Sequence, residues 1–366
     1  MIGKIFKMGF ALIGAALMFA LYQIAHKVPA LVEYVYSRGI YPFFTKTIGR
    51  VSAALPFSLA ELLLYLLIAG IVFFIGYIIA ALFKPRGEKL LHIGKRLLSF
   101  ASLLCTLYSI FVLFWGLNYA RLPLADSMGL DTSSGYTTAQ LRELCTDLID
   151  TCNTLRTQVD EDENGVYRLS CTRESVMEQM GDIYDAYAPD YMNKAAHCAV
   201  KPVKTPNALS RIETSGIFSP FTLEPNLNMQ MPDLYFASTA AHEYAHLQGF
   251  AREDEANFIA WYVLSQSDRP DLAYSANADA LRSALNAYYR TGAEDYAEVY
   301  GLLCEGVRRD YSAQSAYWKP FRDTKIAEVS DKVYNSYLNS NGVADGTRSY
   351  GRMVDLMLAL RAETTP

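Results

Sequence analysis

Histidine is scarce in this 366-residue chain, which contains five, and none of the six cysteines forms a Cys-x-x-Cys pair. Without such pairs, a zinc cluster held by thiolates is not expected. The later part of the chain has no basic stripe, which disfavours binding to nucleic acid. Internal repeats and low-complexity tracts are also absent.

Charge is divided unevenly along the chain. The segment before Asn118 carries 11 Lys and Arg against 3 Asp and Glu, a net charge of +8. The remainder carries 22 against 35, a net charge of −13, and the two values sum to the −5 of the whole chain. This asymmetry predicts two parts in two environments, a membrane anchor over residues 1–118 and a second domain over residues 119–366.

Three uncharged stretches of the basic part approach the length of about 20 residues that a helix needs to cross a bilayer. They are Met8–Ala25, Leu62–Phe83 and Leu97–Leu117. No Ala-x-Ala-like cleavage site follows the first stretch, and two more stretches come after it. We therefore expect a retained anchor of three transmembrane helices in a lipid bilayer, not a cleaved signal peptide.

The basic residues beside these stretches predict an orientation. Seven lie at the start of the chain and in the short loop between the second and third stretches: Lys4, Lys7, Lys84, Arg86, Lys89, Lys95 and Arg96. Four lie in the longer loop between the first two stretches: Lys27, Arg38, Lys46 and Arg50. Because basic loops stay inside the cell, we expect a multi-pass protein of the cell membrane with a cytoplasmic N-terminus and an extracytoplasmic domain over 119–366.

The loop from His26 to Pro56 is too aromatic for a plain linker, so we expect it to lie along the membrane interface or to pack on the outer domain. In that domain, apolar periodicity predicts helices from Thr138 to about Val159 and from about Arg173 to Tyr187. Two or three short strands are expected in the Pro-, Ser- and Thr-rich stretch before Asp233, with helices after it. The prediction is a mainly α, α+β domain with a small sheet.

The cysteines of this domain leave their pairing open. Cys145 and Cys152 lie on one predicted helix, two turns apart, which is too far for a disulfide. Other pairings remain possible if the domain lies outside the cell.

The stretch "AAHEYAHLQGF" contains two of the five histidines. Positions four residues apart share one face of a helix, so His242 and His246 can bind a single ion. Glu243, one residue further round, can reach a water on that ion. This His-Glu-x-x-His arrangement predicts a zinc site with Glu243 as the general base of a metallopeptidase, because zinc lowers the pKa of a bound water towards about 7.

A third protein ligand is expected, since a catalytic zinc keeps one of four positions open. Gly249 suits the end of the first helix, and a second helix then begins in "REDEANF". Glu253 is the preferred ligand, and Glu255 is the alternative. Asn257 lies four residues after Glu253, where it can hydrogen-bond a ligating histidine from outside the ligand set. Acidic residues also occur at helix starts only because they complement the helix dipole.

The sequence "HEYAH" followed by "EDEAN" resembles the zincin metallopeptidases of the glutamate-ligand type. The resemblance implies a zincin-like domain with Glu253 as ligand and Asn257 outside the ligand set, where these enzymes usually have aspartate. The gap between His246 and Glu253 is short for this class. The whole chain also resembles the bacterial membrane proteins of domain-of-unknown-function family 3810, through "YSRGIYPF", "LPFS", "GIFSPFTLEPNLN" and "NGVADGTRSYGRMVDL". This second resemblance implies a membrane-anchored, zinc-dependent peptidase and no particular substrate.

Further residues are weaker candidates. Glu224, in the predicted sheet, either binds a substrate amine or caps a turn. Tyr350, with Arg348, is a candidate donor to the oxyanion, and His197 is interpreted as an ordinary, partly buried histidine. We expect hydrolysis of peptides or proteins outside the cytoplasm, with Zn²⁺ as cofactor. The alternative is a non-catalytic membrane module that binds a protein or peptide partner. Cleavage at or inside the membrane is disfavoured, because the motif lies more than a hundred residues after the last predicted span.

Overall fold

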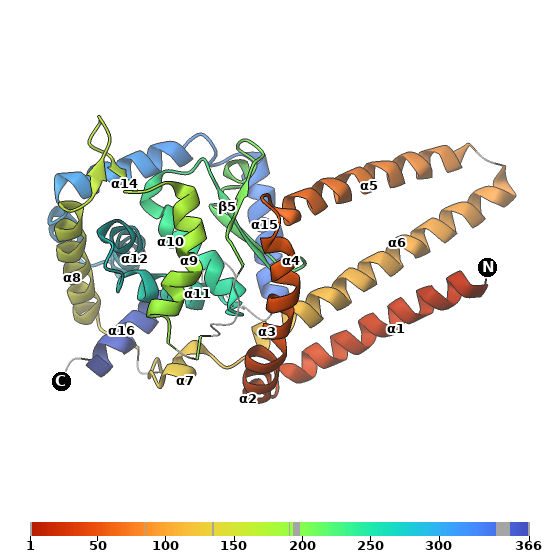
Figure 1. Cartoon of the computed structure of the whole chain (residues 1–366), viewed down its shortest axis with the longest axis horizontal. Coiled ribbons are helices and arrows are strands. Elements are labelled where there is room, and N and C mark those ends of the chain that lie inside the picture. Colours follow the sequence, from red (N-terminus) through yellow and green to blue (C-terminus); the bar gives the residue numbers. More distant parts are fainter. Residues whose placement is uncertain are drawn as a thin grey trace.

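Three long helices extend from one side of the molecule (Figure 1). They are α1 (Ile2–Ala25), α5 (Leu59–Leu82) and α6 (Arg86–Phe114). The computed structural model describes residues 2–83, 85–133, 135–189, 191–192, 198–341 and 352–364. Within these residues, α5 and the His92–Phe114 part of α6 are long and apolar enough to cross a membrane. A third candidate span exists only if Gly9–Ala25 and Pro29–Ala53, bent by 109°, count as one.

The segment between α1 and α5 is helical and packs on the domain, the second of the two positions expected for it. Its α-helical turns and wider π turns follow one another as α2 (Pro29–Leu31), η1 (Val32–Ile40), α3 (Tyr41–Phe44), η2 (Thr45–Gly49) and α4 (Arg50–Ala53). Tyr36 and Tyr41 are buried, and so is the charged Glu33. A buried charge needs an ion-pair partner, and the domain supplies it.

The remainder of the chain is mainly helical, as predicted. Helix α8 begins with a capping box between Thr137 and Gln140 and ends at Arg156, slightly before the predicted end. Helix α9 spans Arg173–Tyr187, as expected from its periodicity. The other helices are η3 (Gly116–Ala120), α7 (Leu124–Met128), η4 (Ser210–Ile212), η5 (Asp233–Tyr235), α10 (Phe236–Leu247), α11 (Glu253–Leu264), α12 (Pro270–Arg290), α13 (Tyr296–Gly301), α14 (Glu305–Trp318), α15 (Lys325–Ser340) and α16 (Met353–Thr364).

A three-stranded sheet lies just before α10 in the sequence, where short strands are predicted. Its order is β3 (Lys201–Val203), β5 (Glu224–Asn228) and β4 (Gly216–Ser219), with β3 parallel and β4 antiparallel to β5. Strand β4 is therefore at an edge. A small hairpin of β1 (Asp160–Glu161) and β2 (Tyr167–Arg168) was not expected from the sequence. Its turn is held by Asp162, whose carboxylate accepts from the Asn164 and Val166 amides.

The hydrophobic core is built around α10, α11 and α12 and includes Tyr244, Phe258 and Tyr274. The same cluster continues through Trp115 and Tyr41 into the segments that join the long helices. Buried apolar contacts thus cross the boundary predicted at Asn118, whose position as a domain boundary stays a prediction. All six cysteines are free.

Candidate metal centre

Helix α10 carries the histidine pair close to its C-terminal end. Its alanines, among them Ala237, Ala241 and Ala245, are fully buried, and small side chains let neighbouring helices approach closely. The ring centroids of His242 and His246 are 4.7 Å apart. The spacing of four residues therefore produces the shared face predicted from the sequence.

The chain reverses directly after α10 at Gly249, whose φ of +88° lies in the left-handed region that favours glycine. The Gly249 amide donates to the His246 carbonyl over 2.8 Å, and the Phe250 amide donates to the Ala245 carbonyl over 3.2 Å. These two bonds form a Schellman motif. The tight turn is short enough for α11 to begin at Glu253, beside the histidines.

The turn brings together three side chains of the kinds that bind metal ions. One ligand atom each from His242, His246 and Glu253 lies within 4.8 Å of the others. Glu253 Oε2 is 3.1 Å from His242 Nε2 and 3.6 Å from His246 Nε2. All three residues line the same cleft, so an ion is able to reach them.

Hydrogen bonds outside this triad orient two of its members. His246 Nδ1 lies 2.7 Å from the Phe250 carbonyl, which can only accept, so Nδ1 carries a proton and Nε2 is the ring nitrogen that faces Glu253. The Tyr334 hydroxyl, on α15, donates to Glu253 Oε1 over 2.5 Å and leaves Oε2 to face the histidines. Nothing in the sequence distinguishes Tyr334 from the other 25 of the 26 tyrosines.

Asn257 does not make the contact expected of it. It lines the cleft, but the orienting bond to His246 comes from the Phe250 carbonyl. His242 Nδ1 is buried without a hydrogen-bond partner in the described part of the chain. The Schellman turn explains the difference, because it places a backbone carbonyl beside His246 before α11 begins.

Burial and mutual charge set the protonation of the site. Burial raises the pKa of Glu243 to about 7, against the opposing effect of the two histidines. Burial would also raise the pKa of Glu253, but His246 and His242 outweigh it and hold that pKa well below the usual range. Burial would lower the pKa of His246, but Glu253 and Glu243 raise it to about 9. Of the two carboxyl groups of the site, Glu243 therefore has the raised pKa and Glu253 the lowered one.

Glu243 packs against strand β4, where Gly216 leaves room for it. A Cβ atom at Gly216 would lie 2.6 Å from Glu243 Oε1 and 2.7 Å from its Cγ. Glu243 Oε2 is buried and has no hydrogen-bond partner among the described residues. A buried carboxylate oxygen of this kind requires a partner, which a water or a bound molecule in the cleft can supply.

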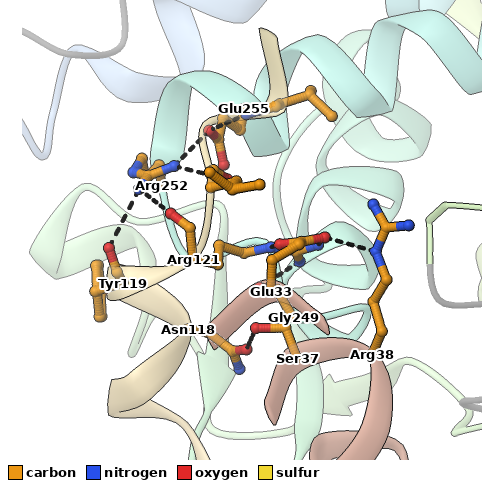
Figure 2. Close-up of polar contacts among 11 residues, drawn as sticks. Glu33, Ser37, Arg38, Asn118, Tyr119, Arg121, Gly249, Arg252 and Glu255 are labelled. Atoms are coloured by element: carbon orange, nitrogen blue, oxygen red, sulfur yellow. Dashed lines mark hydrogen bonds and ion pairs between the residues drawn. The ribbon is translucent and has the colours of Figure 1, made fainter. Parts of the chain in front are cut away.

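Glu255, the alternative ligand, has its carboxylate bonded to Arg252 (Figure 2). Its Oε1 accepts from the Leu124 amide and from Arg252 Nη1, both over 2.7 Å. Arg252 also donates from Nη2 to the Arg121 carbonyl over 2.7 Å. Glu255 therefore joins the start of α11 to the chain that follows α6.

A second buried ion pair holds the Gly249 turn from the other side (Figure 2). Arg121 donates from Nε to Glu33 Oε2 over 2.7 Å and from Nη2 to Glu33 Oε1 over 2.8 Å. Its Nη1 donates to the Gly249 carbonyl over 2.9 Å, and its guanidinium lies 4.0 Å from the Phe250 ring centroid. The Tyr41 hydroxyl adds a 3.0 Å bond to the Leu247 carbonyl. We call Glu33, Tyr41 and Arg121 the turn clamp.

A cleft of about 2280 Å³ contains the triad and Glu243. One side is lined by strand β4 and one by α15, and the cleft continues to α1 and α6 in one direction and to α12 and α14 in the other. Trp115, directly after α6, also lines it. The Trp115 indole packs edge-on against the His246 ring with centroids 5.9 Å apart.

Glu224 lies outside this cleft's lining, which corrects the idea that it binds a substrate amine. It is fully buried, and its two carboxylate oxygens accept from the Leu59 and Ala60 amides over 3.1 and 2.8 Å. These amides begin α5, so Glu224 caps that helix and complements its dipole. Tyr350, Arg348 and His197 lie outside the described residues.

Comparison with known proteins gives one match. A model of the family described as protein of unknown function (DUF3810) matches residues 36–358. No curated protein and no solved structure matches the chain. Because the match covers most of the chain, this protein belongs to the DUF3810 family of proteins of unknown function.

Proposed function

We propose that this protein is a membrane-anchored zinc peptidase that hydrolyses peptide bonds outside the cytoplasm. The observation that carries the proposal is the convergence of His242, His246 and Glu253 beside the buried carboxyl group of Glu243. A zincin-like relationship follows from the same residues, and we propose it on their arrangement and spacing.

The donor set fits a zinc ion. Two ligands at about 2 Å from a tetrahedral zinc lie about 3.3 Å apart. The distances of 3.1 and 3.6 Å from Glu253 Oε2 to the two Nε2 atoms bracket that value. One carboxylate and two imidazoles are also a donor set known from catalytic zinc sites, with the fourth position left to water or substrate. When bound there, zinc would polarise a substrate carbonyl and lower the pKa of a bound water towards about 7.

The residues of the chain then have separate tasks. Glu243, whose pKa is raised to about 7, accepts a proton from the attacking water and delivers it to the leaving amine. Gly216 keeps the edge strand β4 from displacing Glu243. The Phe250 carbonyl and the Tyr334 hydroxyl keep His246 and Glu253 turned towards the ion.

The test uses the full chain in lipid nanodiscs with a mixture of random fluorogenic peptides. Bound zinc and peptide hydrolysis are measured for the native chain and for Glu243→Gln. We expect Glu243→Gln to retain zinc and to lose about 10²- to 10⁴-fold in kcat/KM, the contribution typical of general acid–base catalysis. Hydrolysis at the native rate in this variant would contradict the role of Glu243.

Two further variants test the ligand. Glu253→Ala should lose zinc, whereas Glu255→Gln should keep it, because Glu255 lies in contact with Leu124 and Arg252. Full zinc binding by Glu253→Ala would overturn the ligand assignment. Zinc bound without hydrolysis of any peptide would favour the alternative function, a non-catalytic module that binds a partner.

A further inference from the structure

The end of a candidate membrane span meets the metal centre directly. Helix α6 ends at Phe114, and the next residue, Trp115, packs against His246 with ring centroids 5.9 Å apart. The long sequence separation between α6 and α10 therefore does not correspond to distance in space. It was the reason for disfavouring a site at the membrane, and the structure removes that reason.

The separation between the site and the end of the candidate span equals a few residues of extended chain. Phe111, one turn before Trp115, is about 6 Å from it along the helix axis, at 1.5 Å per residue. Adding the 5.9 Å between Trp115 and His246 gives a path of about 12 Å from the last turn of the span to a metal ligand. An extended peptide covers this path with roughly four residues.

The cleft has an apolar wall on the side of the membrane helices. Leu107, Tyr108 and Phe111 of α6 line it together with Phe19 of α1, which is largely exposed. These side chains continue the apolar surfaces that α1 and α6 present to a bilayer. Among the described residues that line the cleft, none from α1 or α6 is charged, so a polypeptide that leaves the bilayer along this wall meets no charge from these two helices.

Helix α15 supplies a further wall, which also includes the charged Lys325 and Asp331, and its Tyr337 packs against Phe111 of α6. Ile326, Val329 and Val333 line the same cleft and are 54%, 60% and 65% exposed. Their spacing of three and four residues places them on one face of α15. Exposed valine and isoleucine on one face of an otherwise polar helix mark a surface that binds an apolar partner. Tyr334, which follows Val333 in the sequence, contacts Glu253, and both side chains line the same cleft as the triad.

Helices α12 and α14 lie farther from the long helices than α15 does (Figure 1), and the part of the cleft that they line contains the charged residues Asp279, Arg282 and Arg308 beside aromatic ones. The cleft is also lined by Gly216, Ile217 and Phe218 of the edge strand β4. An edge strand binds an extended polypeptide through its unpaired backbone groups, which a lipid tail does not match. The cleft thus changes from apolar to polar along a path suited to a peptide.

We propose that the substrates are membrane-anchored polypeptides, cut in the segment that directly follows their transmembrane helix. The apolar end of that segment lies between α6 and α15, and the polar continuation extends past Glu243 towards α12. This inference rests on the proposed peptidase function and adds the substrate class.

The experiment uses the full chain co-reconstituted in nanodiscs with single-span reporters. Each reporter has a transmembrane helix of leucine and alanine followed by two copies of one cleavable cassette, a peptide sequence drawn from a random mixture. The two copies lie about 5 and about 25 residues from the helix, which is roughly 17 and 85 Å when the chain is extended. Because both cassettes belong to one reporter molecule in one membrane, enrichment of the reporter at the bilayer cannot account for a difference between them in the frequency of cutting. We expect the near cassette to be cut at least about tenfold more often, as counted by mass spectrometry.

A matched pair of variants tests the apolar wall. Val333→Asp places a charge on the exposed wall of α15 and should reduce the ratio of near to far cuts about fivefold or more. Leu302→Asp changes a similarly exposed apolar residue, outside the lining of the cleft, and should leave the ratio unchanged.

The outcomes separate the two proposals. Equal cutting of near and far cassettes, or equal efficiency on the same cassette as a free peptide, would overturn the membrane-anchored substrate while leaving the peptidase in place. An unchanged ratio in Val333→Asp would overturn the role of the α15 face. If no reporter and no free peptide is cut while zinc is bound, the proposed peptidase function itself is overturned.

Discussion

At the scale of single residues, the position of Glu243 depends on a glycine from another element. Gly216 has no side chain, and strand β4 therefore runs close enough to enclose the Glu243 carboxyl group. The enclosure raises the Glu243 pKa to about 7, within the range that a general base needs at neutral pH. The protonation of the site thus follows partly from a residue that carries no charge.

Gly216→Ala should impair catalysis more than folding. The new Cβ would lie 2.6 Å from Glu243 Oε1 and 2.7 Å from its Cγ, and must displace that side chain. Misplacement of a catalytic group by about 1 Å costs roughly 10²-fold in rate, so kcat should fall by about that factor with zinc retained. Peptide hydrolysis and bound zinc are the measurements.

The matched control is Gly301→Ala, where nothing lies within 4 Å of the new Cβ. It should behave like the native chain. Native kcat in Gly216→Ala would show that Glu243 does not depend on the close approach of β4.

Local pattern explains which site residues the sequence could predict. His242 and His246 are related by helix geometry, and Glu253 follows after one glycine turn, so their proximity is encoded within a dozen residues. Gly216, Tyr334 and the capping role of Glu224 depend on contacts between distant segments. No periodicity or spacing reports such contacts, and the bond from His246 to the Phe250 backbone carbonyl likewise has no side-chain signal in the sequence.

At the scale of elements, the turn between α10 and α11 is held by segments that adjoin the long helices. Glu33 belongs to η1, Tyr41 to α3, and Arg121 follows η3. The buried pair between Glu33 and Arg121, which are 0% and 2% exposed, faces the Gly249 carbonyl. The candidate metal site is thus positioned by segments that adjoin the long helices, through the turn clamp.

Arg121→Met should destabilise the protein and weaken zinc binding. Removing one partner of a buried ion pair costs about 3–5 kcal/mol, because the other charge stays buried. The freed Gly249 turn should lower zinc affinity roughly 10- to 100-fold, as loss of outer contacts does at other metal sites. Thermal unfolding in nanodiscs and competition with a chelator measure the two effects.

Arg38→Met is the control, since Arg38 contacts the same Glu33 but is 31% exposed. An exposed pair of this kind contributes about 1 kcal/mol or less, and zinc affinity should stay within about twofold. Equal zinc affinity in Arg121→Met and the native chain would show that the turn clamp does not act on the metal site.

The helices and strands that could be predicted from the sequence are those whose own residues show a clear periodicity. Helices α8 and α9 and the strands before α10 lie where the sequence predicted them. The helical segment between α1 and α5 was expected only as a loop on the interface or the domain, because its π turns carry no familiar sequence signal. Its burial against the domain depends on the Glu33 pair, which is a contact at long range.

At the scale of the whole molecule, the long helices divide the protein into two ends. The beginning of α1 and the adjoining ends of α5 and α6 lie at the end away from the domain (Figure 1). The sequence places Lys4 and Lys7 in that part of α1, and Lys89, Lys95 and Arg96 in the first turns of α6. The two groups of basic residues that predict a cytoplasmic location therefore belong to one end, as three crossings require.

This arrangement predicts that the domain with the metal site lies outside the cytoplasm. Alkaline phosphatase folds only in an oxidising compartment, where its disulfides form. A phosphatase fused after Thr364, which ends α16, should be active. When it is fused after Phe83, which follows α5, its activity should be lower by roughly tenfold or more, because positively charged segments stay in the cytoplasm. A fluorescent protein that matures in the cytoplasm should give the reverse pattern at the same two positions. If the phosphatase were active only after Phe83, the orientation would be inverted and the proposed peptidase would act on chains at the cytoplasmic surface. The geometry between α6 and His246 would still hold the site next to the bilayer, because Trp115 and His246 belong to the same chain and move to either side together.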